Sequence, residues 1–473
     1  MRSSIHASVL NIRGYKEERV INNLPESLIV KIWQQQLLGK TNLATEEGEP
    51  IRIIYPGRIN DDQGADLLDA AITTSQGLLK GDIEVHVKSS DWRAHRHHQD
   101  PTYNRVILHV VMRRNTEATT NLQNGGKVPI LALDKYMGSP ASQWANLVYS
   151  PAILNMPCYQ AIERLPPGII AGFLDSAGEA RFLAKAAKFQ TDLSQMEAGQ
   201  SLYQGIMCAL GYSKNKLPFL ELARRLPLQI LESLTQSKIS DEECLARQQA
   251  LLLGTAGLLP SQRPGWHQKN KIDDRWLEEL EKLWISIPQT EVMSENNWHL
   301  FKVRPSNFPV RRIVAMSYLT LRYREKGILD GVVAKIGEVA VSKGRPRLEK
   351  ALLITTSGYW ASHFDFGAGS RLRIPTLLGH GRAADIAVNV LLPFTFAWSK
   401  LTAQPELARK AFALYCHYPK LVVNTVERHM SKQLGLNGNL VNSARRQQGL
   451  IHIYNTLCSQ GKCHCCPLKG LLG

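Results

Sequence analysis

The sequence predicts an α+β fold, with a small α/β core at residues 24–140 and a large, mostly α-helical region at 150–473. Two patterns indicate this division. Before residue 140, short runs alternate apolar and polar residues with the side-chain period of two that is typical of strands. After it, apolar residues recur mainly at helical spacing. A chain of 473 residues also exceeds one ordinary hydrophobic core, so more than one domain is expected.

The core is expected to contain a helix, three strands, a connection and two further strands, in that order. The helix covers residues 25–38, where Leu28, Ile32 and Trp33 recur at helical spacing and Pro25 suits the first turn. The strands are predicted at residues 51–55, 66–74, 79–88, 105–112 and 128–133. Residues 1–23 are expected to form a basic lead-in before this core.

The region after residue 150 is expected to be a succession of helices with few strands. Its helices are predicted at residues 179–189, 201–210, 216–225, 241–253, 273–284, 311–325, 379–396, 405–415 and 443–457. With 44% hydrophobic and 21% charged residues, the composition is that of a soluble globular protein and excludes wholesale disorder. The first twenty residues show no signal peptide and no apolar run is long enough to span a bilayer, so we expect a cytoplasmic protein without a membrane partner.

Positive charge is concentrated in two segments of the helical region. The chain carries a net charge of +16, of which residues 301–350 contribute +8 and residues 405–473 contribute +7. Such a concentration predicts a polyanionic partner, and nucleic acid is the expected one. The candidate phosphate-binding residues in the first of these segments are Arg304, Arg311 and Arg312. Arginines at the start of a helix can equally be solvated, and that remains the alternative.

One predicted strand carries four ionisable side chains on a single face. The residues that share this face of strand 79–88 are Asp82, Glu84, His86 and Lys88. Four such groups would be costly inside a core without partners, so either water or a bound metal with its substrate must receive them. A strand with one face exposed to water is the alternative interpretation.

An acidic pair on neighbouring predicted strands indicates a metal site. Asp66 opens one strand and Glu84 lies midway along the next, with Asp82 as a candidate third ligand. Carboxylate oxygens bind Mg²⁺ or Mn²⁺, and such a metal activates water and neutralises charge on a scissile phosphate. His86 and Lys88 are then candidate catalytic residues that orient the water or steady the phosphate.

Histidines are dense beside this strand. Five of the 14 histidines in the chain fall within 24 residues, and they are His86, His95, His97, His98 and His109. Imidazoles at this density bind transition metals or transfer protons. His95 and His98 are candidates for substrate contact, whereas His109 is expected to hydrogen-bond a polar neighbour inside the sheet.

Cysteines crowd a second segment near residue 460. Cys458, Cys463 and Cys466 are separated by four and by two residues, a spacing that suits a Zn²⁺ or an iron–sulfur site. The candidates for a fourth ligand are Cys158, His464 and Cys465. A set of reduced, exposed thiols is the alternative.

Phrases along the chain resemble a family of uncharacterised bacterial proteins. They include GDIEVHVKSSDWRAHRHHQDPTYNRVILHVV, ALGYSKNKLPFLELA and QQGLIHIYNTLCSQGKCHCCPL, and the resemblance covers nearly the whole chain from about residue 24. This family is known only as a domain of unknown function, chiefly from Bacteroidetes. The resemblance therefore implies no mechanism.

The core also resembles the PD-(D/E)xK nuclease superfamily. The order helix, three strands, helix, strand, with Asp66 and Glu84 in place, is similar to its signature and implies a restriction-endonuclease-like core. The chain departs from the signature where His86 stands at the lysine position, and Lys88 lies one pleat further. This departure puts the strict chemistry of the superfamily in doubt.

These observations predict a metal-dependent nuclease that hydrolyses phosphodiester bonds of nucleic acid. A protein from another class is the alternative, namely a catalytically inactive nucleic-acid-binding or scaffold protein with a nuclease-like fold. A third interpretation is a histidine-ligated metal hydrolase that acts on a small molecule.

Overall fold

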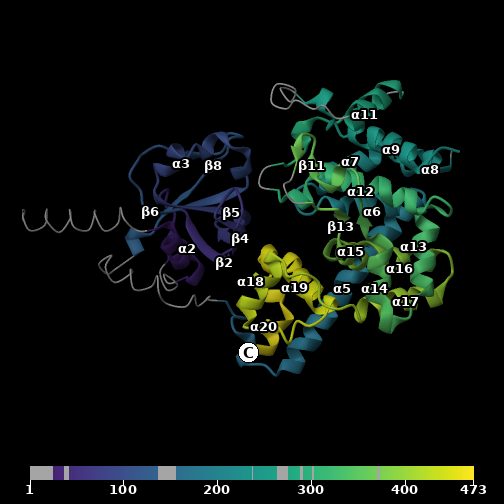
Figure 1. Ribbon diagram of the computed structural model, residues 1–473. Helices are drawn as coiled ribbons and strands as arrows, with labels where there is room; N and C mark the ends of the chain where they lie inside the picture. Colours follow the sequence, from purple (N-terminus) through teal and green to yellow (C-terminus); the bar gives the residue numbers. More distant parts are fainter. Residues whose placement is uncertain are drawn as a thin grey trace, which may run out of the picture. The chain divides into compact units, whose positions relative to one another are not determined.

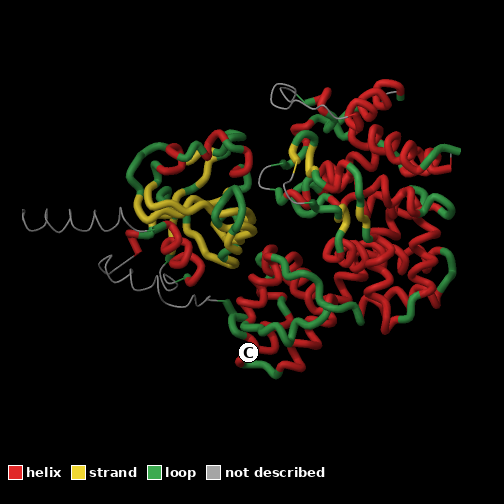
Figure 2. The backbone as a smooth tube through the Cα atoms, viewed as in Figure 1, coloured by secondary structure: helices red, strands yellow, loops and turns green. Residues whose placement is uncertain are grey.

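The structure is a computed structural model that describes residues 25–36, 42–136, 156–236, 238–263, 275–287, 291–300, 303–369 and 373–472. The predicted α+β class is confirmed, because a mixed sheet of N-terminal strands is followed by a large helical region (Figures 1 and 2). The basic lead-in predicted at residues 1–23 lies outside the described residues.

The chain forms two compact units. The first comprises Met1–Ala177, Val423–Val441 and Gly449–Gly473, and the second comprises Gly178–Val422 and Asn442–Gln448. This division differs from the sequence-based one, since the last part of the predicted helical region belongs to the same unit as the sheet. Interactions between residues almost 400 positions apart join this C-terminal part to the sheet. One of them is the hydrogen bond that the Tyr454 hydroxyl donates to Asp69 Oδ2 at 2.7 Å.

The first unit is built on a seven-stranded mixed sheet. Its strands are β1 (Leu43–Ala44), β2 (Pro50–Tyr55), β3 (Arg58–Ile59), β4 (Leu67–Thr74), β5 (Gly77–Lys88), β6 (Val106–Arg113) and β9 (Ile130–Ala132). The order is β1-β2-β4-β5-β6-β9, with β3 paired to β4. β2, β4 and β5 pair antiparallel, whereas β5, β6 and β9 pair parallel. A small hairpin of β7 (Thr120–Asn121) and β8 (Lys127–Val128) precedes β9.

Both faces of this sheet are covered, which determines how the site forms. Helix α2 (Glu26–Gln35) packs Leu28, Ile29 and Trp33 on the aliphatic face that includes Ile83 and Val85. The connection between β5 and β6 covers the opposite face (Figure 1). It contains α3 (Asp91–Ala94) and two 3-10 turns, His97–Gln99 and Pro101–Tyr103. The parallel pairing of β5 and β6 requires such a crossover.

Gly81 allows β5 and β6 to approach each other at the start of their parallel pairing. A Cβ atom at this position would lie 2.3 Å from the backbone oxygen of Arg105 and 2.4 Å from Ile107 Cγ2. We expect Gly81→Ala to lower the free energy of unfolding by about 1–3 kcal/mol, because the two strands must separate. The measurement is the urea midpoint of unfolding.

The matched control for this substitution is Gly172→Ala. Gly172 lies inside α5 (Pro167–Leu193), and a Cβ atom there would meet nothing within 4 Å. Because alanine is the better helix former, this change should raise the free energy of unfolding by up to about 1 kcal/mol. Equal midpoints for the two variants would contradict the close approach at Gly81.

The C-terminal part of the first unit is helical and packs beside the β2 and β4 strands. It consists of α18 (Thr425–Leu434), the end of α19 (Ala444–Thr456) and α20 (Pro467–Leu472). A hydrophobic cluster joins Tyr55 and Ala71 of the sheet to Met430, Tyr454 and Cys458. The cysteine segment is therefore held against the sheet by buried apolar surface.

The second unit is mostly helical and encloses its own hydrophobic core. Its further helices are α6 (Ala198–Leu210), α7 (Lys216–Arg225), α8 (Leu228–Gln236), α9 (Asp241–Thr255), α11 (Arg275–Ser286), α12 (Pro309–Arg322), α13 (Gly327–Glu338), α14 (Gly344–Leu352), α15 (His380–Ile386), α16 (Leu392–Leu401) and α17 (Pro405–Cys416). Two short antiparallel pairs are also present, β10 (Ile354–Thr355) with β13 (Thr376–Leu378) and β11 (His363–Asp365) with β12 (Ala368–Gly369). None of the described helices has the length and apolar composition that crossing a bilayer requires.

A carboxylate and histidine cluster as the candidate functional site

Asp66 and Glu84 are held together by two backbone hydrogen bonds. Asp66 immediately precedes β4, and its N–H donates to Glu84 Oε2 at 3.1 Å. In return, the N–H of Val85 on β5 donates to Asp66 Oδ2 at 3.0 Å. Because each carboxylate accepts from the strand that carries the other, their positions are fixed by the antiparallel pairing of β4 and β5. The two acids that the sequence analysis paired therefore lie side by side.

The polar face of β5 is buried. Asp82 is 4% exposed, Glu84 is 5% exposed and His86 is 1% exposed. The alternative interpretation of an exposed polar face is therefore wrong for these three residues. Buried ionisable groups need partners. The connection between β5 and β6 supplies one partner each, His97 for Glu84 and His95 for His86.

Two histidines approach the Glu84 carboxylate, and a third lies beside one of them. His97 Nε2 lies 3.2 Å from Glu84 Oε1, and His86 Nε2 lies 3.5 Å from the same oxygen. His95 Nδ1 lies 3.2 Å from His86 Nε2. One ring nitrogen from each histidine can be chosen so that all three lie within 4.8 Å of one another. This is a set of ligands that could hold one metal ion.

A buried chain of hydrogen bonds fixes the orientation of His86. Its Nδ1 lies 2.9 Å from Nε2 of His109, whose Nδ1 lies 3.1 Å from the hydroxyl oxygen of Thr120. The expected hydrogen bonding of His109 inside the sheet is thus confirmed. If His86 Nδ1 carries the proton, it donates to His109 Nε2, and His109 Nδ1–H donates to Thr120. This arrangement leaves the lone pair of His86 Nε2 directed toward Glu84 and His95.

Aromatic side chains hold the histidines in place. The ring of Tyr103 stacks on His97 with centroids 3.9 Å apart. Trp92 is 1% exposed and contacts His97 edge-on and His109 at a tilt. The crossover connection therefore aims His97 at Glu84 through packing of its own apolar residues.

The electrostatics of the cluster favour neutral side chains and a bound cation. Burial, followed by the neighbouring Asp66, raises the pKa of Glu84 to about 9. Burial raises the pKa of Asp66 as well. Burial lowers the pKa of His86 to about 2 and that of His109 to about 3, with the nearby histidines adding to the effect. Buried carboxylates close together and neutral imidazoles beside them are the combination that a metal ion stabilises.

Glu26 is an exposed acid whose charge acts on the cluster, and the sequence analysis missed it. It lies in the first turn of α2. Burial and then the charge of Asp66 raise its pKa, and His95, Asp91 and His97 also act on it. Glu26 in turn contributes to the raised pKa of Glu84. No local motif could reveal it, because the helix that carries it is 40 residues before Asp66 in the chain.

Two of the candidate site residues on β5 lie away from this cluster. Asp82 Oδ1 accepts from the N–H of Asp69 at 3.0 Å and lies 3.5 Å from Arg105 Nη2. It belongs to a separate ion-pair group with Asp69 and Arg105. Lys88 donates its backbone N–H to Asp91, but its ammonium makes no hydrogen bond or ion pair among the residues that the structure describes.

The crossover connection presents cationic and polar groups to solvent beside the cluster. His95 is exposed, as are Arg93 and Arg96 on the same connection. His98 is half-buried, and its Nδ1 has no hydrogen-bond partner among the described residues. These exposed groups are placed to meet an anionic ligand, and Arg93 and Arg96 were not singled out from the sequence.

Comparison with known families decides where the chain belongs. A family described as "Protein of unknown function (DUF2851)" matches residues 26–420. The chain belongs to this family. No curated protein and no solved structure matches it. The matched range contains the whole carboxylate and histidine cluster and ends before the cysteine segment at residue 458.

The arginines predicted to bind phosphate are placed differently by the structure of this DUF2851 chain. Arg311 is 1% exposed and Arg312 is 5% exposed. The guanidinium of Arg311 donates to four backbone carbonyls, those of Trp360, His363, Ile374 and Thr376. The guanidinium of Arg312 likewise donates to a backbone carbonyl, a side-chain amide oxygen and a tyrosine hydroxyl. The expectation that these two residues bind phosphate is therefore corrected, whereas Arg304 is exposed.

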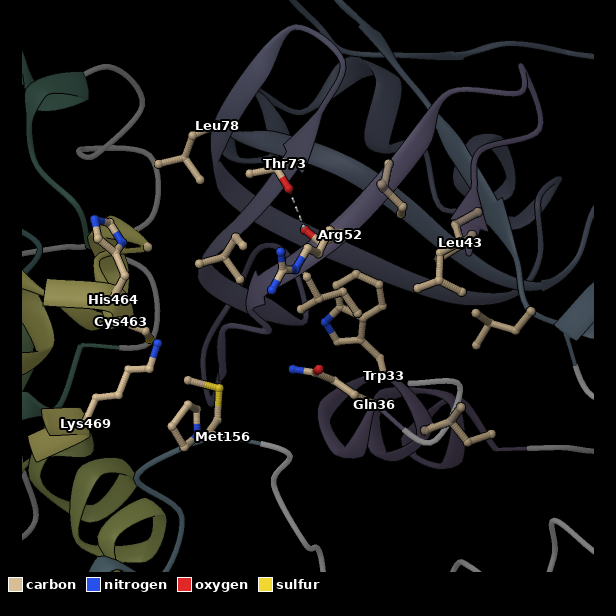
Figure 3. Close-up of a pocket in the computed structure, with 18 of the residues that line it drawn as sticks. Trp33, Gln36, Leu43, Arg52, Thr73, Leu78, Met156, Cys463, His464 and Lys469 are labelled. Carbon is tan, nitrogen blue, oxygen red and sulfur yellow. Dashed lines mark hydrogen bonds between the residues drawn. The ribbon is translucent and has the colours of Figure 1, made fainter. Parts of the chain in front are cut away.

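A cavity of about 870 Å³ lies elsewhere in the first unit (Figure 3). Its lining includes Trp33, Arg52, Met156, Cys463 and Lys469. The carboxylates and histidines of the cluster do not line this cavity. It therefore borders the cysteine segment and is separate from the candidate active site.

Proposed function

We propose that this protein is a metal-dependent nuclease, with Asp66, Glu84, His86 and His97 at its active site. The observation that carries the proposal is the reciprocal backbone pairing of Asp66 and Glu84 beside three histidines. Two carboxylates on adjacent strands are the usual ligands of a metal that hydrolyses phosphodiester bonds.

The order of the elements supports a nuclease of the PD-(D/E)xK type. Helix α2, strands β2, β4 and β5, helix α3 and strand β6 follow one another, with β6 parallel to β5. Asp66 and Glu84 occupy the positions of the two acids in that signature, and His86 stands where it has lysine. This is a likeness of arrangement, so the activity is argued from the site itself.

The residues present suit a metal with affinity for both oxygen and nitrogen ligands. Asp66 and Glu84 would hold it, and His97 would complete the set, since its buried Nε2 lacks a hydrogen bond although it lies 3.2 Å from Glu84 Oε1. When bound, the metal would activate water and neutralise charge on the phosphate. The carboxylates suit Mn²⁺ and the imidazole suits Zn²⁺, whereas Mg²⁺ is usually bound by oxygen ligands.

The protein's own groups would orient the reactants around this centre. His86 is neutral at physiological pH because its pKa is lowered to about 2, so the lone pair of its Nε2 can accept a hydrogen bond from His95 Nδ1, 3.2 Å away, or from a water molecule that replaces it. The His109 and Thr120 chain keeps that lone pair in place. His95, Arg93 and Arg96 are exposed beside it and would contact the phosphates of the nucleic acid.

The direct test is cleavage of labelled single- and double-stranded DNA and RNA in the presence of Mn²⁺, Mg²⁺ or Zn²⁺. We expect cutting with Mn²⁺ and its loss in EDTA. Asp66→Asn keeps the acceptor for the Val85 N–H and should reduce the rate by more than about 100-fold, because a metal ligand is weakened. The control is Glu47→Gln, which changes an exposed carboxylate of the same unit and should leave the rate unaltered.

The alternative function predicts a different result in the same assay. A scaffold or nucleic-acid-binding protein would bind the labelled strands, with affinity that falls steeply as salt is raised. Binding without metal-dependent cutting, or cutting by Asp66→Asn at the wild-type rate, would contradict the nuclease proposal.

A further inference from the structure

Four cysteines from two distant segments meet in the first unit. Cys158 follows the sheet in sequence, whereas Cys458, Cys463 and Cys466 lie some 300 residues later. Cys458 is 5% exposed and belongs to the hydrophobic cluster around Tyr55 and Tyr454, and the other three cysteines are partly buried against the same cluster. The fold has therefore gathered four thiols from two ends of the chain into one apolar environment.

The four thiols influence one another electrostatically. Burial raises the pKa of Cys458 well above its ordinary value, and Cys158, Cys463 and Cys466 raise it further. Burial raises the pKa of Cys463 to about 11, with contributions from Cys158 and Cys466. Gln433 of α18 donates its side-chain N–H to Cys158 Sγ at 3.1 Å. The shared hydrophobic cluster and this hydrogen bond place the thiols of both segments beside α18.

We propose that Cys158, Cys458, Cys463 and Cys466 bind an iron–sulfur cluster. This site is separate from the carboxylate and histidine cluster, and it does not depend on the nuclease activity proposed above. Four thiolates are the usual ligand set of such clusters, and they are deprotonated when they bind. The cluster would fasten the Cys458–Cys466 segment to the segment that follows the sheet.

The spacing of the cysteines favours an iron–sulfur cluster over a zinc ion. Cys458, Cys463 and Cys466 are separated by four and two residues, which is the spacing of the first three ligands in plant-type iron–sulfur ferredoxins. Structural zinc sites more often contain two pairs of ligands, and the members of each pair are separated by a few residues. Here the fourth cysteine stands alone, far away in the sequence.

The neighbouring Cys465 provides a matched control. It lies between two of the proposed ligands in sequence, but its side chain is exposed. Cys208, Cys244 and Cys416 belong to the second unit and are not candidates for the same site. A cysteine-to-serine change at position 465 therefore tests the chemistry of the substitution without removing a ligand.

The test is to purify the full chain without oxygen and to measure iron, acid-labile sulfide and zinc, together with the visible absorption spectrum. We expect about two to four irons per chain, an equal amount of sulfide and a broad band near 400 nm. Cys458→Ser should lose at least about nine-tenths of the iron, whereas Cys465→Ser should retain it. Equal iron in the two variants, or about one zinc per chain and no iron, would overturn the proposal.

A second measurement avoids dependence on the folding of a variant. Wild-type protein is treated with an alkylating reagent before and after the cluster is destroyed with oxidant and chelator, and the modified residues are identified by mass spectrometry. We expect Cys465 to react at once and the four proposed ligands to react only after the treatment. Rapid modification of Cys158 and Cys466 in the untreated protein would overturn the proposal whether or not nucleic acid is cut.

Discussion

Replacing Arg311 with methionine is expected to unfold the second unit. The side chain begins in α12 and ends among four carbonyl oxygens, three of which it contacts at 2.6, 2.6 and 3.1 Å. A buried carbonyl without a donor costs about 1–3 kcal/mol, so four of them approach the whole stability of a typical domain, about 5–15 kcal/mol. The measurement is the urea midpoint of unfolding, with the soluble yield recorded beside it.

Arg304 provides the control for this prediction. It lies seven residues earlier and is exposed, so Arg304→Met should change the free energy of unfolding by less than about 0.5 kcal/mol. Arg311→Lys should be intermediate or as severe, because one ammonium has three donors and cannot reach four divergent carbonyls. A wild-type midpoint for Arg311→Met would show that the carbonyls do not depend on this guanidinium.

The contrast between Arg304 and Arg311 shows what a local pattern can predict. Both are arginines beside prolines in a basic segment, and the sequence gives no sign of which is buried. The burial of Arg311 is decided by carbonyls some 50–65 residues later in the chain, around β11 and β13. Such long-range partners leave no periodicity near the arginine itself.

Most of the sheet, by contrast, was predictable from local patterns. The alternation in residues 79–88 predicted a strand with one ionisable and one aliphatic face, and β5 spans Gly77–Lys88. Helices α13 and α14 were not predicted, since three glycines in α13 and Pro346 in α14 weaken the helical signal. Tertiary packing in the second unit compensates for these residues.

The candidate site was predictable only in part, because local patterns specify its strands but not the segments that pack against them. Asp66 directly precedes β4 and Glu84 lies on β5, so their approach follows from the antiparallel pairing of these strands once the register is right. Their partners come from the crossover connection and from α2, and neither register nor alternation specifies those contacts. Alternation specifies only the face of the strand. Asp82 and Lys88 were therefore grouped with Glu84 because they share its face, although their side chains lie at other positions along the strand.

The last prediction separates the two buried acids of β5. Glu84→Gln should reduce metal-dependent cutting by more than about 1,000-fold, because the proposed ligand loses its charge. The same variant should not lose stability in the metal-free protein. Burial raises the pKa of Glu84 to about 9, so the folded state holds this proton while the unfolded state releases it above about pH 4.5. The stability contributed by the carboxyl therefore falls as pH rises through that window, and a neutral glutamine removes this penalty at pH 8.

Asp82→Asn is the matched control, since Asp82 lies two residues earlier on the same strand face and is equally buried. It loses the charge opposite the exposed Arg105 and should cost up to about 1 kcal/mol, while cutting per folded molecule stays within about threefold of wild type. Glu84→Gln should thus lose activity and keep its stability, whereas Asp82→Asn should lose some stability and keep its activity. Loss of activity in both variants, in proportion to their loss of stability, would mean that this face is structural, and the metal site would have to lie elsewhere.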